Sequence, residues 1–169
     1  VNVTASPTAI CVGSSATLSA TGATSYTWNR GALTTSSIVV TPTTSTTYTV
    51  RGATGTCSST RTITLIVNPN PTVTAVVSPT AICSGSSATL TGGGALTYTW
   101  MPGSLTGSNA VVSPTITTTY TLTGANATGC RNTRTVTLVV NPNPTLTATA
   151  SPTNICSGAG TTVTLTASG

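Results

Sequence analysis

The chain has 169 residues, and its only charged side chains are five arginines, which give a formal net charge of +5. The absence of Asp, Glu, His and Lys removes the groups on which acid–base catalysis and hard-cation binding mostly depend, so we expect no enzyme, no metal and no cofactor. The arginines form no dense cluster that would bind nucleic acid, and no apolar run reaches the roughly 18–20 residues that cross a bilayer, so neither nucleic acid nor membrane insertion is expected.

A tandem repeat organises the sequence. The segment Ser-Pro-Thr-Ala-Ile-Cys at 6–11 returns unchanged at 78–83 and with one substitution at 151–156, so its cysteines are 72 and 73 residues apart. Asn-Pro-Asn-Pro follows each complete repeat, and two prolines in four residues predict a linker that limits bending. We predict two complete domains and the first part of a third, joined by two linkers: domains 1–67, 72–140 and 145–169, and linkers 68–71 and 141–144.

The first repeat is rich in Thr, Val and Ile, which favour β-strands, and turn residues interrupt it at short intervals. Pro7 should end the first strand because proline cannot donate a hydrogen bond to a neighbouring strand. We expect a turn at 11–15 and a hairpin loop at 52–57. The pattern predicts up to seven strands, of which six can be bounded: 1–5, 16–20, a strand at 26–28, 38–40, 46–51 and 60–67.

Aromatic residues occupy the same places in both complete repeats. Tyr26 and Trp28 are two residues apart, so both rings should lie on one face of a strand. Short strands, a Trp on the third and a Tyr opening a later one are typical of an immunoglobulin-like β-sandwich, and we predict an all-β fold of tandem domains of this kind. Tyr48 and Tyr120 should form tyrosine corners, in which the hydroxyl bonds to upstream backbone. All these rings are expected in the core, and sugar stacking is the alternative for the two tryptophans: Tyr26, Trp28, Tyr48, Tyr98, Trp100 and Tyr120.

Five cysteines without metal-binding partners indicate disulfides and an oxidising compartment. We favour pairing within repeats, Cys11 with Cys57 and Cys83 with Cys130, where closing each loop would contribute about 4 kcal/mol through the entropy of the unfolded chain. This pairing requires the first strand to kink at 6–7, because the two loops of a usual sandwich lie at opposite ends. In the alternative, domains stacked end to end place Cys11 near Cys130 of the next repeat.

The third repeat stops just past its second strand, expected at 162–166, and leaves Cys156 unpaired. We expect the segment to be cut from a longer array with many more repeats. The alternative is that a neighbouring molecule completes the third domain by adding strands. Two sequons, at Asn2 and Asn126, are candidate glycosylation sites.

The segments SPTAICVGSSATLSATG, YTWNRG and VVTPTTSTTYTVRGATGTCSSTRTITLIVNP, with their second copies, resemble the immunoglobulin-like or PKD-like repeats of giant surface proteins of Bacteroidota. Such repeats occur in type IX-secreted adhesins, including proteins similar to gliding-motility adhesins. The resemblance implies an extracellular location, either secreted or at the cell surface, and a structural role.

We therefore expect a structural repeat segment of an extracellular adhesin or filament, a disulfide-stabilised rod whose partners are neighbouring repeats of the same or identical chains. The near-absence of charge favours lateral packing into homopolymeric or filamentous assemblies, because electrostatic repulsion is small. Three alternatives remain open. The chain is a carbohydrate-binding module with glycans as partners, the stalk of a secreted enzyme, or a self-polymerising fibre subunit completed by strand addition.

Overall fold

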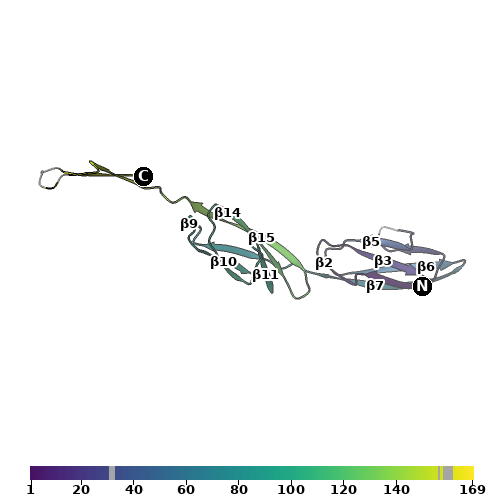
Figure 1. Ribbon diagram of the computed structural model, residues 1–169. Helices are drawn as coiled ribbons and strands as arrows, with labels where there is room; N and C mark the ends of the chain where they lie inside the picture. The colour runs from purple at the N-terminus through teal and green to yellow at the C-terminus, as the bar shows by residue number, and fades with distance from the viewer. Residues whose placement is uncertain (31–32, 156, 158–161) are drawn as a thin grey trace.

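The computed structural model describes residues 1–30, 33–155, 157 and 162–169. The regular secondary structure of these residues consists of β-strands alone, numbered β1 to β17 in chain order. Figure 1 shows two sandwiches and a hairpin that follow one another in line. The described part of the chain holds no helix with the length and apolar character that a membrane crossing needs.

The first sandwich packs two sheets against each other. One sheet has the order β1-β3-β5 and the other has the order β2-β7-β6-β4, with β2 parallel to β7 and the remaining pairs antiparallel. Along β6 the first, third, fifth and seventh residues are buried, because successive side chains of a strand point to opposite faces. The strands are β1 (Asn2–Ser6), β2 (Ala9–Cys11), β3 (Ala16–Thr21), β4 (Ser25–Trp28), β5 (Ser37–Val40), β6 (Thr46–Thr54) and β7 (Cys57–Asn68).

The second sandwich repeats this plan with one addition. A sheet of order β8-β10-β13 faces a sheet of order β12-β11-β14-β15-β9, in which the short β12 is an extra edge strand and β9 again runs parallel to β15. The strands are β8 (Thr74–Ser78), β9 (Ala81–Cys83), β10 (Ala88–Gly93), β11 (Thr97–Met101), β12 (Leu105–Thr106), β13 (Asn109–Val112), β14 (Thr118–Ala125) and β15 (Arg131–Asn141).

The entry strand of each sandwich is divided between its two sheets. β1 pairs with β3 up to Ser6, and β2 pairs with β7 from Ala9, so the chain changes sheets around Pro7. The change falls there because proline has no N–H to donate to a ladder. Two packed, mostly antiparallel sheets of about seven short strands with a buried tryptophan define an immunoglobulin-like sandwich, so the predicted fold class is confirmed.

Two local predictions in the first repeat differ in their outcome. The turn predicted at 11–15 is present, since Ser14 N donates to Cys11 O at 3.0 Å, and Cys11 is also the last residue of β2. The expected hairpin loop at 52–57 is a two-residue turn around Gly55, because β6 and β7 stay paired down to that turn. Gly55 has a φ of +59°, a backbone conformation that tight hairpin turns use and that glycine adopts at little steric cost.

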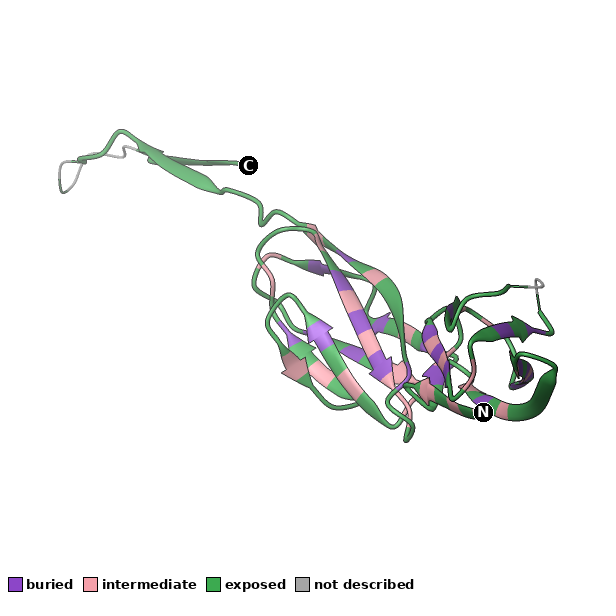
Figure 2. Cartoon of the chain, turned by 90° about the vertical axis from the view of Figure 1, so that its right-hand side faces the viewer, coloured by how far each residue is buried: buried purple, intermediate pink, exposed green. Residues whose placement is uncertain are grey.

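Buried and exposed residues alternate along the strands of both sandwiches, as the coloured bands in Figure 2 show, and each core contains a buried tryptophan. Trp28 is 1% exposed and Trp100 is 0% exposed, and each indole N–H donates to a backbone carbonyl, at 2.9 Å to Thr35 O and 3.2 Å to Gly107 O. Sugar stacking needs an exposed ring face, so that alternative is wrong for both tryptophans. The fully buried aliphatic side chains that surround them are Leu18, Val50, Leu65, Leu90, Leu122 and Leu138.

The tyrosine hydroxyls bond differently from expectation. The Tyr26 hydroxyl donates to Ala23 O at 2.9 Å and accepts from Ala23 N at 3.0 Å, and Tyr98 makes the same two bonds with the residue three before it. Tyr48 and Tyr120 are buried, yet neither hydroxyl makes a backbone hydrogen bond among the described residues. The tyrosine-corner prediction is therefore wrong, and the bond between hydroxyl and upstream backbone belongs to the tyrosine that precedes each tryptophan.

The third repeat contributes a two-stranded antiparallel sheet, β16 (Thr147–Ser151) paired with β17 (Thr164–Ser168), which places the second strand two residues later than expected. All residues of both strands are exposed. Leu165 is 80% exposed, whereas the leucines at the same place in the first two repeats, Leu18 and Leu90, are fully buried. The prediction that Cys156 is unpaired falls outside the described residues.

Candidate functional site

A disulfide joins the two sandwiches. Cys11 of the first repeat is bonded to Cys130 of the second, with 5.5 Å between their Cα atoms, and Cys57 and Cys83 are exposed free thiols. The pairs Cys11–Cys57 and Cys83–Cys130 that we favoured from the sequence are therefore wrong. The alternative, in which neighbouring repeats are linked to each other, is the one that the structure shows.

The length of β7 explains why pairing within a repeat fails. Cys57 begins β7, and Cys11 lies opposite Asn68 at the other end of the same strand. A strand rises about 3.3 Å per residue, so the two cysteines are separated by roughly 36 Å along the sandwich. A disulfide needs Cα atoms within roughly 7 Å. The expected kink at Pro7 does occur, and it transfers the strand to the other sheet. Cys11 nevertheless stays at the end of the sandwich that is opposite Cys57.

The linker between the sandwiches begins as part of the first one. Val12 N donates to Asn68 O at 3.0 Å, which extends the parallel pairing of β2 and β7 beyond Cys11. The amide of Asn70 then donates to Val12 O at 3.3 Å. Residues 68–70 of the Asn-Pro-Asn-Pro segment are thereby held against the turn that begins at Cys11.

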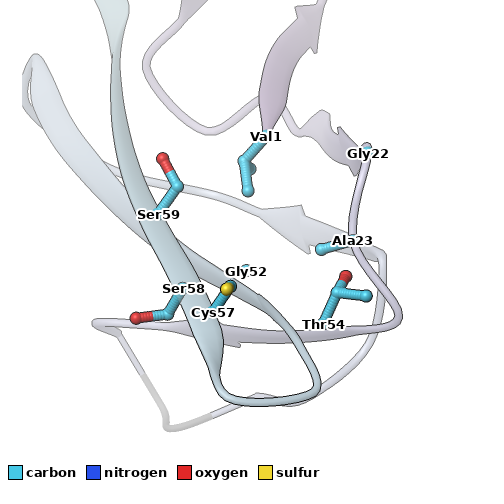
Figure 3. A pocket seen from close by; sticks show the side chains of 8 residues that line it. All are labelled: Val1, Gly22, Ala23, Gly52, Thr54, Cys57, Ser58 and Ser59. Atoms are coloured by element: carbon cyan, nitrogen blue, oxygen red, sulfur yellow. The ribbon is translucent and has the colours of Figure 1, made fainter.

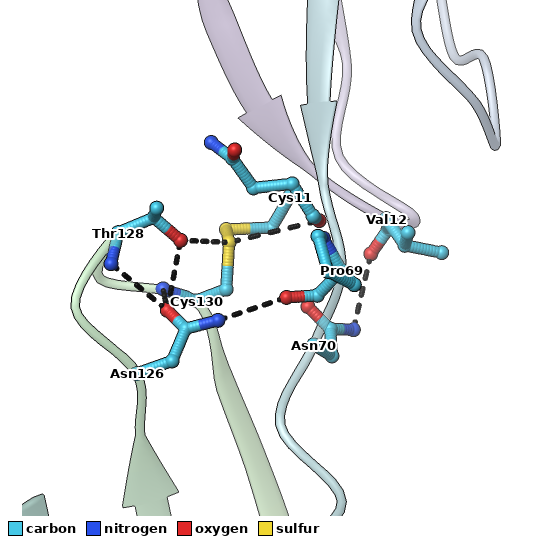
Figure 4. The surroundings of a disulfide bond; sticks show 8 residues. Cys11, Val12, Pro69, Asn70, Asn126, Thr128 and Cys130 are labelled. Atoms are coloured by element: carbon cyan, nitrogen blue, oxygen red, sulfur yellow. Dashed lines mark hydrogen bonds between the residues drawn. A yellow bond between two sulfur atoms is a disulfide. The ribbon is translucent and has the colours of Figure 1, made fainter. Parts of the chain in front are cut away.

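The hairpin loop of the second sandwich is arranged around Asn126, as Figure 4 shows. Its Oδ1 accepts hydrogen bonds from Thr128 N, from Thr128 Oγ1 and from Cys130 N, at 3.1, 2.8 and 3.0 Å. Its Nδ2 donates to Pro69 O of the linker at 2.9 Å. One side chain therefore both shapes the loop that presents Cys130 and connects that loop to the linker.

This role bears on Asn126 as a candidate glycosylation site. The nitrogen that a glycan would modify is the Nδ2 that donates to Pro69 O, and it lies beside the buried Cys130. Asn2 lies in β1 and is exposed. Between the two sequons, the geometry disfavours a glycan on Asn126 and leaves the prediction for Asn2 as it was.

The last residue of the linker, Pro71, is enclosed by the second sandwich. Asn132 Nδ2 donates to Pro71 O at 3.1 Å, and Pro71 is buried. Gly94 has a φ of +82°, and a Cβ built on it would overlap the carbonyl oxygen of Thr72. Glycine is needed there because backbone passes directly over it. The junction thus consists of one disulfide, three hydrogen bonds from asparagine amides to backbone carbonyls, and a buried proline.

Outside the junction, the polar side chains that the structure describes make isolated contacts. The Arg30 guanidinium lies 5.8 Å from the centre of the Tyr48 ring, and Arg51 donates to Ser58 Oγ at 2.9 Å. Burial raises the pKa of Tyr120 above its usual value of 10.0. In the described part of the chain no three residues of the types that bind metals come together. The feature that distinguishes the molecule is the junction.

The fold and this junction define a tandem immunoglobulin-like array whose neighbouring domains are cross-linked by a disulfide. No protein-family model matches the chain, and no curated protein matches it.

Several solved structures are similar to it in outline. The Ca2+-stabilized adhesin of an Antarctic bacterium that binds ice is 16% identical, with 90% of this chain and 52% of that one covered and a TM-score of 0.41. The three N-terminal domains of the bacteriophage RB49 highly immunogenic outer capsid protein are 13% identical, with 98% and 67% covered and a TM-score of 0.40. Murine CEACAM1b is 13% identical, with 83% and 100% covered and a TM-score of 0.36. At this level of similarity, none of them indicates what the chain does.

Proposed function

We propose that the chain is a structural repeat segment of an extracellular surface adhesin or filament and that its function is mechanical. The observation that carries the proposal is the position of the disulfide, which joins two sandwiches. A cross-link within a sandwich stabilises that sandwich against unfolding. A cross-link between sandwiches fixes how one domain is placed on the next, which is what a rod requires.

The junction restricts bending in three ways. The linker contains two prolines, which fix the backbone φ at both positions. Its carbonyls at Pro69 and Pro71 accept hydrogen bonds from the second sandwich, and its Asn70 donates to the first. The disulfide then closes a covalent ring across the joint. A hinge between the sandwiches would have to break all the hydrogen bonds while the disulfide still limits the separation.

The disulfide also determines where tension passes. A pull on the two ends of the chain runs through residues 1–11, crosses the bond from Cys11 to Cys130 and continues along β15. Residues 12–129, which include most of both cores, lie in a ring outside this path. The ring cannot be extended by force as long as the disulfide is intact. This arrangement suits a segment that transmits force between a cell and whatever it adheres to.

Several features support the location and partners that we propose. Structural disulfides persist in oxidising compartments, which favours a secreted or cell-surface protein. The missing carboxylates, lysines and imidazoles argue against an enzyme, although the same rod could display an enzyme or a sugar-binding domain as its stalk. The partners that fit the junction are neighbouring repeats of the same or identical chains. The low charge favours their packing side by side.

One observation favours a second candidate, a fibre subunit completed by strand addition. Leu165 in β17 and Leu146, which directly precedes β16, are about four-fifths exposed, at 80% and 79%. In the second sandwich the matching leucine, Leu90, is covered by the opposite sheet of the sandwich. Strands from a neighbouring molecule could cover the hairpin in the same way.

Immuno-electron microscopy of the source cells tests the proposed function. Antibodies raised against the two complete sandwiches should label extended structures at the cell surface, with an axial period that equals one repeat. Treatment with a reductant should make the same structures more flexible. Label confined to the cell interior, or to compact particles without a period, would overturn the proposal.

A further inference from the structure

Cys57 lies beside a hollow at the outer end of the first sandwich. The hollow has a volume of about 210 Å³ and is lined by Val1 before β1, by Gly22 and Ala23 between β3 and β4, and by residues of β6 and β7, among them Gly52, Thr54 and Ser59. Figure 3 shows Cys57 among the residues that line the hollow, and Cys57 pairs with Thr54 across the hairpin. The hollow and the thiol therefore belong to one surface, at the end of the sandwich opposite the known junction.

The second sandwich has an equivalent surface, and the linker covers it. Gly94 corresponds to Gly22, and the linker backbone at Thr72 passes over Gly94. Pro71, which precedes Thr72, is buried, and its carbonyl oxygen accepts a hydrogen bond from the Asn132 amide. Asn132 corresponds to Ser59 of the first sandwich. The hollow of the first sandwich is thus the site that the Asn-Pro-Asn-Pro linker occupies in the second, and Cys57 has the position of the disulfide-bonded Cys130.

Cys83 has the complementary arrangement. Cys83 lies opposite Asn141 in the parallel pair of β9 and β15, as Cys11 lies opposite Asn68. Ser84 N donates to Asn141 O at 2.9 Å, and the Asn143 amide donates to Ser84 O at 3.4 Å. The first sandwich has the same two bonds, at 3.0 and 3.3 Å. The Cys83 end therefore already has the geometry that the Cys11 end has in its junction.

From these correspondences we infer that Cys57 and Cys83 are the open halves of two further junctions of the same type. Cys57 and the adjacent hollow receive the Asn-Pro-Asn-Pro linker and the cysteine of a repeat placed before this one in tandem. Cys83 bonds to the hairpin cysteine of a repeat placed after it. The occupant in each case is another repeat of this kind, and the inference rests on the proposed function as a rod of repeats.

Each new bond needs an oxidant, which we take to be a disulfide. One thiolate attacks that disulfide and forms a mixed disulfide, and one thiol leaves. The second cysteine then displaces the other thiol, so two protein thiols become one disulfide while the oxidant is reduced to two thiols. Both Cys57 and Cys83 are exposed, which gives such an oxidant access.

The hairpin of the first sandwich differs from that of the second at the residues that would contact a linker. Asn126 and Asn132 donate to linker carbonyls in the known junction, whereas Thr54 and Ser59 stand at these places in the first repeat. Hydroxyl groups also donate to carbonyls, so the hollow keeps its donors. The hairpin at Cys57 is also shorter by one residue than the hairpin at Cys130.

Linked in this way, the disulfides would overlap along the rod. The bond from Cys11 to Cys130 encloses Cys83 within its ring, and the bond from Cys83 would leave that ring for the next repeat. Each linker would then be bridged by its own disulfide. Every residue of a complete repeat would then lie inside at least one of two interleaved rings.

Two extended forms of the full chain test the inference, both with Cys156→Ser. The first adds a second copy of residues 95–144 after Gly169, which completes the third sandwich with its hairpin cysteine. The second adds a copy of residues 1–72 before Val1, which places a linker and a Cys11 equivalent ahead of Cys57. After air-equilibrated oxidation with a glutathione disulfide buffer, free thiols are alkylated without reduction, and fragments are mapped by mass spectrometry.

We expect Cys83 to be bonded to the added hairpin cysteine in the first form, and Cys57 to be bonded to the added Cys11 equivalent in the second. Cys83→Ser in the first form should leave the added hairpin cysteine alkylated. The inference is overturned if Cys83 and Cys57 are alkylated in forms whose Cys11–Cys130 bond is intact, or if they bond between molecules in disulfide-linked dimers. Either outcome leaves the proposed rod of two cross-linked sandwiches untouched, because that proposal is tested at the cell surface.

Discussion

Breaking the bond between Cys11 and Cys130 should change how far the chain extends under force. The disulfide closes a ring whose ends are 119 residues apart in the sequence. An extended chain spans about 3.4 Å per residue, so unfolding the ring after reduction should release about 400 Å of contour length. With the disulfide intact, only the short segments before Cys11 and after Cys130 can extend, which amounts to roughly 170 Å at most.

Single-molecule force spectroscopy with handles at the two ends measures this difference. The oxidised chain, the chain in dithiothreitol and the Cys130→Ser variant are compared, and the last two should behave alike. The double variant Cys57→Ser/Cys83→Ser is the matched control, because it removes two thiols and keeps the disulfide; it should resemble the oxidised chain. If the oxidised chain releases the full length of both sandwiches, the disulfide does not lie where the account places it, and the proposed path of tension fails.

Three further perturbations address the junction, the core and the buried tyrosine. Asn126→Ala removes one donated and three accepted hydrogen bonds at the junction, so a small thiol should reduce Cys11–Cys130 about tenfold faster, and an unchanged rate would show that Asn126 does not hold the loop. Trp100→Ala empties the centre of the second core and should lower its free energy of unfolding by about 3–5 kcal/mol in urea titrations, whereas a loss near zero would contradict the burial of this ring. Because burial raises the pKa of Tyr120 above 10.0, the contribution of this residue to stability should be unchanged below pH 10.0 and should fall as the pH rises beyond it. Urea titrations at increasing pH should therefore show a smaller loss of stability for Tyr120→Phe than for the unsubstituted chain, and an equal loss would refute this.

Much of the fold followed from the sequence because local rules agreed with the tertiary structure. Pro7 interrupts the entry strand wherever that strand goes, and a Tyr-x-Trp pattern can bury both rings only on one face of a strand. The repeat itself then transferred each assignment from the first sandwich to the second. These features depend on a few neighbouring residues and on alternation, which a sequence displays directly.

The site could not be assigned in the same way, because it depends on which end of a sandwich each loop reaches. Cys11 and Cys57 occur in one repeat, yet β7 separates them by its full length, and only the parallel pairing of β2 shows this. Nothing local marks Asn126 as the residue that joins the loop to the linker. One signal was present: the extra residue in the second hairpin lies where Asn126 shapes the loop that presents Cys130.

The proposed rod depends on the disulfide between Cys11 and Cys130, and peptide mapping of the alkylated, unreduced chain shows whether that bond forms. Trypsin alone leaves Cys83 and Cys130 in one fragment, since no arginine lies between them, but cyanogen bromide cleavage at the single methionine, Met101, separates them. We predict that the fragment of Cys11 is bonded to the fragment of Cys130, with Cys57 and Cys83 alkylated. A bond between the fragments of Cys11 and Cys57 would contradict the account.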